Sequence, residues 1–211
     1  MAHLLHIESS LAGDNSVSRA VAKEYVAEWQ ARNPDGVVTY RDLAAQPPTH
    51  LDWTAVSAGM TPEEQRGPEQ TEAVKARGTY IGEVSAADEV VFTAPMYNFS
   101  IPSTLKAWID QIMVHGLTLA DGTNPGLLGG KKITIVTSQG GSYAPGTPKD
   151  GWDHVTPYLT HVVEALGAED VEFVNVHMTL SGVNPALAEF QPLFHASRAA
   201  ATDAVKVRVS A

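Results

Sequence analysis

Along this chain, short apolar runs alternate with longer segments whose apolar positions recur every three or four residues. The short runs are bounded by Gly, Pro or polar residues, which is typical of buried strands. They lie at residues 3–10, 36–43, 89–95, 131–139 and 170–178. The longer segments have the period of amphipathic helices. They lie at residues 16–33, 62–87, 103–115, 154–167 and about 185–205.

Two of these predicted helices show their buried faces clearly. The apolar face of Ser16–Asn33 consists of Val21, Tyr25, Val26 and Trp29, and that of Ser103–His115 of Leu105, Trp108, Ile109, Ile112 and Met113. In the segment 62–87, we expect Pro68 to interrupt the helix, because proline lacks a backbone N–H and its ring clashes with the preceding turn. A long loop is expected before it, and a loop rich in Gly, Asn and Pro at Gly116–Gly130.

The alternation of strands and helices indicates βαβ units and a parallel sheet. We therefore predict an α/β fold, a flavodoxin-like three-layer sandwich with a five-stranded parallel sheet, in which residues 1–211 form a single domain. In such sheets, ligands bind beyond the carboxyl ends of the strands, close to the point where the strand order reverses. The segments that follow the first, third and fourth strands are therefore the places to search for a site.

Composition narrows the kinds of partner. The 211-residue chain has a formal net charge of -10 and a pI near 5.1, which disfavours nucleic acid and anionic membranes as partners. It has no Cys, which excludes disulfides, thiolate metal sites and Cys nucleophiles. We find neither a secretory signal nor an apolar run of the roughly 20 residues that a membrane span needs, and we predict a cytoplasmic protein.

The segment after the first strand, "ESSLAGDNSVSRA", is rich in hydroxyl and amide side chains at the start of a predicted helix. They are Ser9, Ser10, Asn15, Ser16 and Ser18. Unpaired N–H groups and the positive end of the helix dipole suit an anion there, such as a phosphate monoester. Arg19 could assist or face solvent. The alternative is plain capping of the helix by Asn15 or Ser16. The segment has no G-x-G-x-x-G or G-x-x-x-x-G-K-[ST] motif, which disfavours a Rossmann-type NAD domain and a P-loop NTPase.

The segment after the third strand, "APMYNFSIPS", is a rigid turn because Pro95 and Pro102 fix the backbone on both sides. Backbone N–H groups beside Met96, Tyr97 and Phe99 suit a flat heteroaromatic ring. The alternative is a hydrophobic loop packed under a neighbouring helix.

The segment after the fourth strand, "TSQGGSYAPG", offers Ser138 and Gln139 followed by two glycines. Gly140 and Gly141 allow a ligand to approach the backbone, and Gln139 supplies a donor and an acceptor for a uracil-like edge. The alternative is a glycine-rich turn without a ligand. Together, a phosphate seat, a ring cradle and donors for the far edge of the ring describe a pocket for flavin mononucleotide (FMN).

These motifs resemble those of the FMN-dependent NADH azoreductases, flavodoxin-like enzymes related to the NAD(P)H:quinone oxidoreductases. The resemblance rests on "SSLAGDNSVSR", on "APMYNFSIP" with "LKAWID" after it, and on "TSQGG", and it runs over nearly the whole chain. It implies that Ser10, Ser16, Val17 and Ser18 bind the FMN phosphate. It implies further that Pro95, Met96, Tyr97, Asn98 and Phe99, with Ser138, Gln139, Gly140 and Gly141, hold the isoalloxazine ring.

The resemblance also implies a homodimer and ping-pong chemistry, in which NADH reduces the flavin and a quinone or azo compound then takes its place. The flavin carries the hydride chemistry, which explains why the turn after the third strand needs no nucleophile. The chain departs from the family pattern at Leu119 and Ala120, where many relatives have an aromatic residue, and at Gln139, where they often have a basic one.

Two other functions remain open from the residues. A flavodoxin-like FMN electron carrier without its own catalysis would need the same pocket. A serine hydrolase is the second alternative, although "TSQGGS" does not match G-x-S-x-G and the S-x-x-K at Ser103–Lys106 lacks a following K-T-G. The histidines form no H-x-x-x-H pair, so no metal site is predicted.

Overall fold

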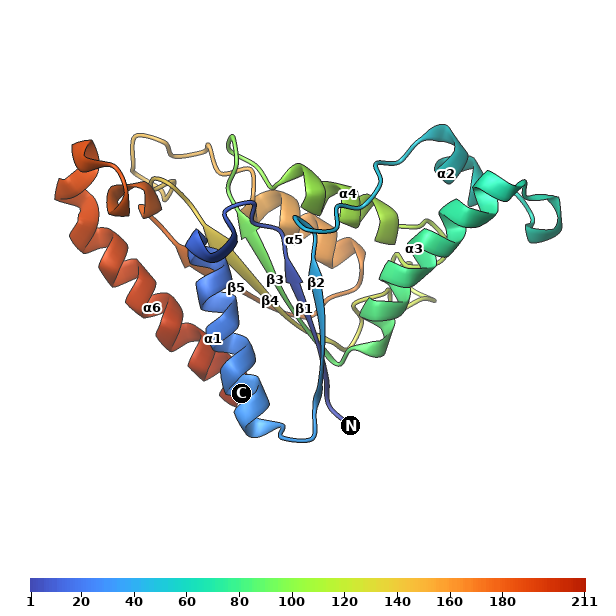
Figure 1. Ribbon diagram of the computed structural model, residues 1–211, viewed down its shortest axis with the longest axis horizontal. Helices are drawn as coiled ribbons and strands as arrows, with labels where there is room; N and C mark the ends of the chain where they lie inside the picture. The colour runs from blue at the N-terminus through green and yellow to red at the C-terminus, as the bar shows by residue number, and fades with distance from the viewer.

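A five-stranded sheet runs through the centre of the computed structural model, which describes residues 1–211 (Figure 1). Its strands are β1 (His3–Glu8), β2 (Val37–Asp42), β3 (Glu89–Pro95), β4 (Lys132–Ser138) and β5 (Asp170–Val176). All are parallel, in the order β2-β1-β3-β4-β5, which is the order of flavodoxin-like sheets. The predicted fold class is therefore confirmed.

Helices cover both faces of the sheet (Figure 1). One face is covered by α1 (Val17–Arg32) and α6 (Gln191–Ser210), and the other by α3 (Pro68–Ala86), α4 (Ser103–Ile112) and α5 (Thr156–Ala165). The short α2 (Trp53–Ala58) and the first turns of α3 project beyond the sheet (Figure 1). None of the helices combines the length and the apolar character needed to cross a membrane.

Each face of the sheet has its own apolar core, because successive strand residues point to opposite faces. Leu4 and Val91 pack with Tyr25 and Trp29 of α1 and with Val205 of α6. On the other face, a larger cluster joins strand residues to the apolar stripes of α4 and α5. Its members include Leu5, Val90, Ile133, Leu105, Ile109, Leu159 and Val163. The helix faces predicted from the sequence are the ones that the sheet buries.

The region before β3 differs from the sequence prediction. Pro68 does not interrupt a helix: it begins α3, where its missing N–H has no helical partner to lose. The N–H of Gly67 donates to the Gln70 side chain at 3.1 Å and completes this helix start. In the stretch expected to be a loop, Asp52 accepts a 2.8 Å hydrogen bond from the Ala55 N–H and caps α2.

The C-terminal helix also begins later than predicted. Pro185–Phe190 forms 3-10 turns, labelled η4, because Leu187 leaves the helical region with φ of -112°. Helix α6 then starts at Gln191, with Pro192 in its first turn, and continues to Ser210.

The two edges of the sheet are built differently. The loops after β1, β3 and β4 gather at the carboxyl edge, at the top of Figure 1. The loop 113–131 lies at the opposite edge, where the Ala120 N–H donates to Ala165 O at the end of α5 at 2.9 Å. There Gly126 and Gly167 approach so closely that a Cβ on Gly167 would lie 1.8 Å from Pro125 O.

Candidate functional site

The loop after β1 forms a helix start with free backbone donors. A 3-10 turn, η1 (Gly13–Asn15), leads into α1, and Ser16 caps the helix by accepting a 3.2 Å hydrogen bond from the Arg19 N–H. The N–H groups of Val17 and Ser18 have no acceptor within the protein. The sequence left capping and anion binding as alternatives, and this geometry permits both, because the Ser16 hydroxyl caps one N–H and leaves two free.

Arg19 lies beneath this loop and points into the protein. Its Nε and Nη2 donate to Ser10 O at 3.2 and 2.7 Å, and its Nη1 and Nη2 donate to the Asp42 carboxylate at 2.7 and 2.9 Å. These hydrogen bonds lower the pKa of Asp42 to about 2. Arg19 thus neither faces solvent nor offers its N–H groups to a ligand. It joins the ends of β1 and β2 to the start of α1.

A buried polar cluster supports the loop from below. The Glu8 carboxylate lies 2.8 Å from His6 Nε2 and accepts a 3.0 Å hydrogen bond from the Thr93 hydroxyl. The Ser9 N–H donates to that hydroxyl at 2.9 Å. This cluster was not predicted from the sequence, although His6 and Glu8 alternate with apolar residues in a strand and therefore share one face.

The turn after β3 also presents free backbone donors. Tyr97 and Ser100 exchange hydrogen bonds of 2.8 and 3.1 Å, and Asn98 and Phe99 between them have φ of 50° and 72°. Two positive φ values define a type I′ turn. The N–H groups of Asn98 and Phe99 have no acceptor within the protein, as the predicted ring cradle requires.

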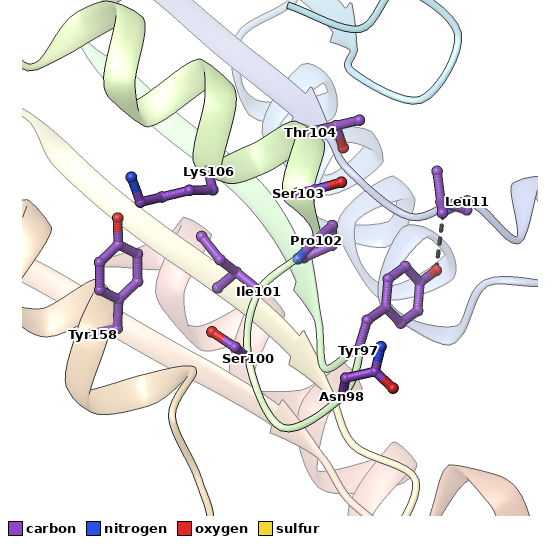
Figure 2. Close-up of a pocket in the computed structure, with 10 residues that line it drawn as sticks. All are labelled: Leu11, Tyr97, Asn98, Ser100, Ile101, Pro102, Ser103, Thr104, Lys106 and Tyr158. Atoms are coloured by element: carbon purple, nitrogen blue, oxygen red, sulfur yellow. Dashed lines mark hydrogen bonds between the residues drawn. The ribbon is translucent and has the colours of Figure 1, made fainter. Parts of the chain in front are cut away.

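Tyr97 joins this turn to the loop after β1. Its hydroxyl oxygen accepts a 3.0 Å hydrogen bond from the Leu11 N–H (Figure 2). The same oxygen lies 3.3 Å from the Ser10 hydroxyl. Beside the turn lies a cavity of about 520 Å³, to which α4 contributes Lys106 and α5 contributes Tyr158 (Figure 2). The Thr104 hydroxyl, at its wall, is buried without a hydrogen-bond partner.

The loop after β4 is held by its own contacts. Gln139 is buried: its Nε2 donates to Asp153 at 3.2 Å, and its Oε1 lies 2.9 Å from His177 Nδ1. Burial lowers the pKa of His177, which favours the neutral ring. The Gln139 side chain, which was predicted to hydrogen-bond the edge of a ring, thus already hydrogen-bonds two protein side chains. Close to it, the Ser138 carbonyl accepts a 2.8 Å hydrogen bond from the Met96 N–H and ties the loops after β3 and β4 together.

Aromatic contacts join the same two loops. Phe99 packs edge-on against Trp152, with ring centroids 5.3 Å apart, and against Tyr143, with centroids 6.4 Å apart. A Cβ on Gly140 would lie only 2.7 Å from Leu180, so the first glycine of the pair allows the loop after β4 and the segment after β5 to pack closely. At Gly141 the same Cβ would meet nothing closer than 3.9 Å, so the backbone stays open there.

Comparison with known proteins identifies the family. Residues 2–196, nearly the whole chain, match a family described by its flavodoxin-like fold. The chain is 57% identical over 211 residues to the FMN-dependent NADH:quinone oxidoreductase of Parafrankia sp. (strain EAN1pec), with 100% of both chains covered. It is 55% identical over 210 residues to the protein of the same name from Frankia casuarinae, again with 100% of both covered. The chain belongs to this family.

Solved structures show the same fold at much lower identity. The azoreductase AzrA superposes with a TM-score of 0.85 at 23% identity and covers 100% of both chains. An azoreductase from Bacillus anthracis str. Sterne superposes with a TM-score of 0.83 at 23% identity, over 98% of this chain and 99% of the other. These structures confirm the fold, and the family match with the curated relatives confirms the family resemblance stated from the sequence motifs.

The structure places the residues predicted to bind FMN together at the carboxyl edge of the sheet. The three loops that contain Ser10, Ser16–Ser18, Pro95–Phe99 and Ser138–Gly141 are joined by the hydrogen bonds of Tyr97 and Met96. Leu119 and Ala120 are not among them, because the loop 113–131 lies at the other edge of the sheet. In a single chain they cannot contact a ligand at the carboxyl edge.

Proposed function

We propose that this protein is an FMN-dependent NADH:quinone oxidoreductase that also reduces aromatic azo compounds. The observation that carries the proposal is the pairing of two sets of free backbone donors at one edge of the sheet, at Val17 and Ser18 and at Asn98 and Phe99. Relatives that share more than half of their residues with this chain over its full length carry the name FMN-dependent NADH:quinone oxidoreductase. One of the solved azoreductases is described in complex with FMN.

The residues present fit the two ends of FMN. A phosphate needs donors without competing carboxylates, and the Val17 and Ser18 N–H groups lie at the positive end of the α1 dipole beside the hydroxyls of Ser16 and Ser18. Of the acidic groups around this seat, Glu8 and Asp42 are paired with Arg19. Asp14 is exposed and pairs with Lys23 at 3.1 Å.

The ring would lie against the turn at Asn98 and Phe99. FMN held here would supply the hydride and two-electron chemistry between NADH and the acceptor, and the protein's own residues would supply position and electrostatics. Backbone N–H groups at Asn98 and Phe99 are donors fixed before the ligand arrives, which is the arrangement that stabilises developing negative charge most effectively. Pro95, Met96 and Tyr97 hold the turn in place, and Ser138–Gly141 border its far side.

NADH and the acceptor would use the same open face in turn, giving ping-pong kinetics. A homodimer fits the position of Leu119 and Ala120, since the loop 113–131 can reach a site only on a second copy. The electron-carrier and serine-hydrolase alternatives are not favoured, because the curated relatives are named as oxidoreductases.

The first test of the function is spectroscopic. The purified protein is loaded with FMN and mixed with NADH without oxygen, and menadione is then added. We expect the flavin absorbance to bleach with NADH and to return with menadione. FMN that stays oxidised in the presence of NADH would refute the oxidoreductase and favour the carrier.

A second test addresses the phosphate seat. Val17→Pro removes one of the two free N–H groups at the first helical position, where proline is well tolerated. The preceding Ser16 already has the extended conformation that a following proline requires. We expect weaker binding of FMN and unchanged binding of riboflavin, which lacks the phosphate. Trp53→Pro, at the equivalent position of α2, is the matched control. Equal binding of FMN by the Val17→Pro variant and the wild type would show that the N–H of Val17 does not bind the phosphate.

A further inference from the structure

A second cavity, of about 450 Å³, lies between the loop after β4, the 3-10 turn η3 (Thr179–Gly182) and the start of α6. It shares no residue with the cavity of Figure 2. Gly140 and Gly141 form one side, so it adjoins the loop proposed to border the ring. Its other walls are mainly apolar and include Tyr143, Met178, Leu180, Leu187, Phe190 and Leu193.

The wall formed by η3 is held rigidly against the loop after β4. The Met178 N–H donates to Gly141 O at 3.2 Å, and the Leu180 N–H donates to Gly140 O at 3.3 Å. Met178 has φ of 60°, a left-handed conformation that a long side chain adopts only where the surrounding structure imposes it. The cavity is therefore formed before any ligand binds, as small-molecule sites usually are.

Large apolar side chains remain exposed around this cavity. Leu180 is 51% exposed and Leu193 is 58% exposed, on two different elements that face the same space. Lys149 is the one charged residue among the lining residues, and its Nζ lies 5.5 Å from the centroid of the Tyr143 ring. Such a surface suits an apolar ligand rather than a polar or ionic one.

Tyr143 connects the cavity to the turn after β3. It lines the cavity and packs edge-on against Phe99, whose backbone N–H faces the proposed ring seat. A ligand with a flat head group beside Phe99 could thus extend an apolar chain past Tyr143 into the cavity. This continuity favours one extended substrate over two separate ligands.

We propose that this cavity binds the apolar side chain of a quinone whose head group is reduced at the flavin. The inference rests on the proposed function and specifies its substrate class: quinones that carry an alkyl or isoprenoid chain. The volume of about 450 Å³ falls in the range of roughly 300–1,000 Å³ that small-molecule sites have. Binding of the chain is non-covalent and changes no step of the redox reaction.

The test compares two quinones with the same ring. The FMN-loaded enzyme is assayed for kcat/KM with menadione and with its analogue that carries an n-hexyl chain at the free ring position. Each fully buried methylene favours binding by about fourfold, and part of the chain stays open to solvent, so we expect a preference of roughly tenfold or more for the hexyl analogue. The ratio of the two constants cancels any general effect on the flavin chemistry.

Variants at Leu193 test whether binding of the chain in this cavity causes the preference for the hexyl analogue. Leu193→Asn makes the wall polar and Leu193→Trp fills the space, and both are expected to bring the ratio close to one. The matched control is Val207→Asn, because Val207 lies on the same helix, is 68% exposed and does not line the cavity. This control is expected to keep the wild-type ratio.

A binding measurement separates this inference from the proposed function. Quenching of tryptophan fluorescence by the hexyl analogue gives its Kd for the oxidised enzyme even if neither quinone is reduced, an outcome that would refute only the proposed function. A ratio near one in the wild type, an unchanged ratio in both Leu193 variants, or an equal loss in Val207→Asn would overturn the proposed chain site. So would a change of oligomeric state in the Leu193 variants, measured by sedimentation, because a second copy of the chain would then cover this surface.

Discussion

Replacing Arg19 with lysine tests whether the phosphate seat depends on geometry or on charge. Lysine keeps the positive charge but offers a single ammonium in place of the planar fork of arginine. That fork holds Ser10 O with hydrogen bonds of 3.2 and 2.7 Å and Asp42 with hydrogen bonds of 2.7 and 2.9 Å. If Arg19 acted by attracting phosphate, Arg19→Lys would bind FMN normally. We expect that it does not.

The expected magnitude follows from these contacts. A hydrogen bond to a charged group contributes about 1.5–3 kcal/mol. Lysine can replace roughly two of the four, so the loss of the other two should lower the free energy of unfolding by about 3–6 kcal/mol. Of this lost free energy, only the share from the hydrogen bonds that fix Ser10 and the start of α1 should weaken FMN binding. The hydrogen bonds to Asp42 join Arg19 to the end of β2 and should affect stability alone. We expect that part to be about 1.4 kcal/mol, which corresponds to a tenfold larger Kd for FMN.

The assay is a titration of the apoprotein with FMN and, separately, with riboflavin, followed by flavin fluorescence. Because riboflavin has no phosphate, its Kd should be unchanged in Arg19→Lys. Lys23→Gln is the control: Lys23 is exposed on the same helix and pairs with the exposed Asp14 at 3.1 Å, so the variant removes a charge without disturbing the seat. The reasoning is refuted if riboflavin binding weakens as much as FMN binding, or if Lys23→Gln has the larger effect.

Three further predictions concern other contacts. The pKa of Asp42 is lowered to about 2, so its stabilisation is complete above its usual value of 3.8 and is lost as the pH falls toward 2. In urea unfolding, Asp42→Asn should therefore lower the free energy of unfolding by about 2 kcal/mol at neutral pH and by progressively less in acid; a constant difference would contradict this. Gly167→Ala should destabilise the protein by more than Gly122→Ala in thermal unfolding, because both have φ near 85° but only Gly167 has a backbone atom within 1.8 Å of the added Cβ. Tyr97→Phe should weaken FMN binding by roughly threefold to tenfold in the same fluorescence titration, because the loops after β1 and β3 lose their shared hydroxyl; unchanged binding would show that the two loops are placed independently.

The sheet could be predicted from the sequence because its determinants are local. Each strand is a short apolar run between breakers, and the stripe of α4 buries Leu105 and Ile109 as its period requires. Helix α2 could not be predicted in the same way, because six residues are too short to show a helical period. The role of Pro68 depended on whether a helix preceded or followed it, and the cap provided by Gly67 and Gln70 decided that.

The positions of the candidate site residues were predictable, but several roles were not. A parallel sheet places the strand ends at one edge, so the three loops had to meet there. Arg19 could not be assigned because its partner Asp42 lies 23 residues away, on a neighbouring strand. For Gln139, the side chain has the donor and acceptor that a ligand would need, but it hydrogen-bonds Asp153 and His177 instead. Both partners follow Gln139 in the chain and could not be paired with it from the sequence.

The close backbone packing of Gly126 against Gly167 limits where substitutions can be tolerated in this enzyme. It lies at the edge where the strands begin, whereas the proposed chain site, the ring cradle and the phosphate seat lie where the strands end. Substitutions in η3 and at the start of α6 can therefore reshape the acceptor site without disturbing the tight backbone packing that holds the far edge together. The separation leaves the acceptor site free to change while the rigid framework at the far edge stays the same.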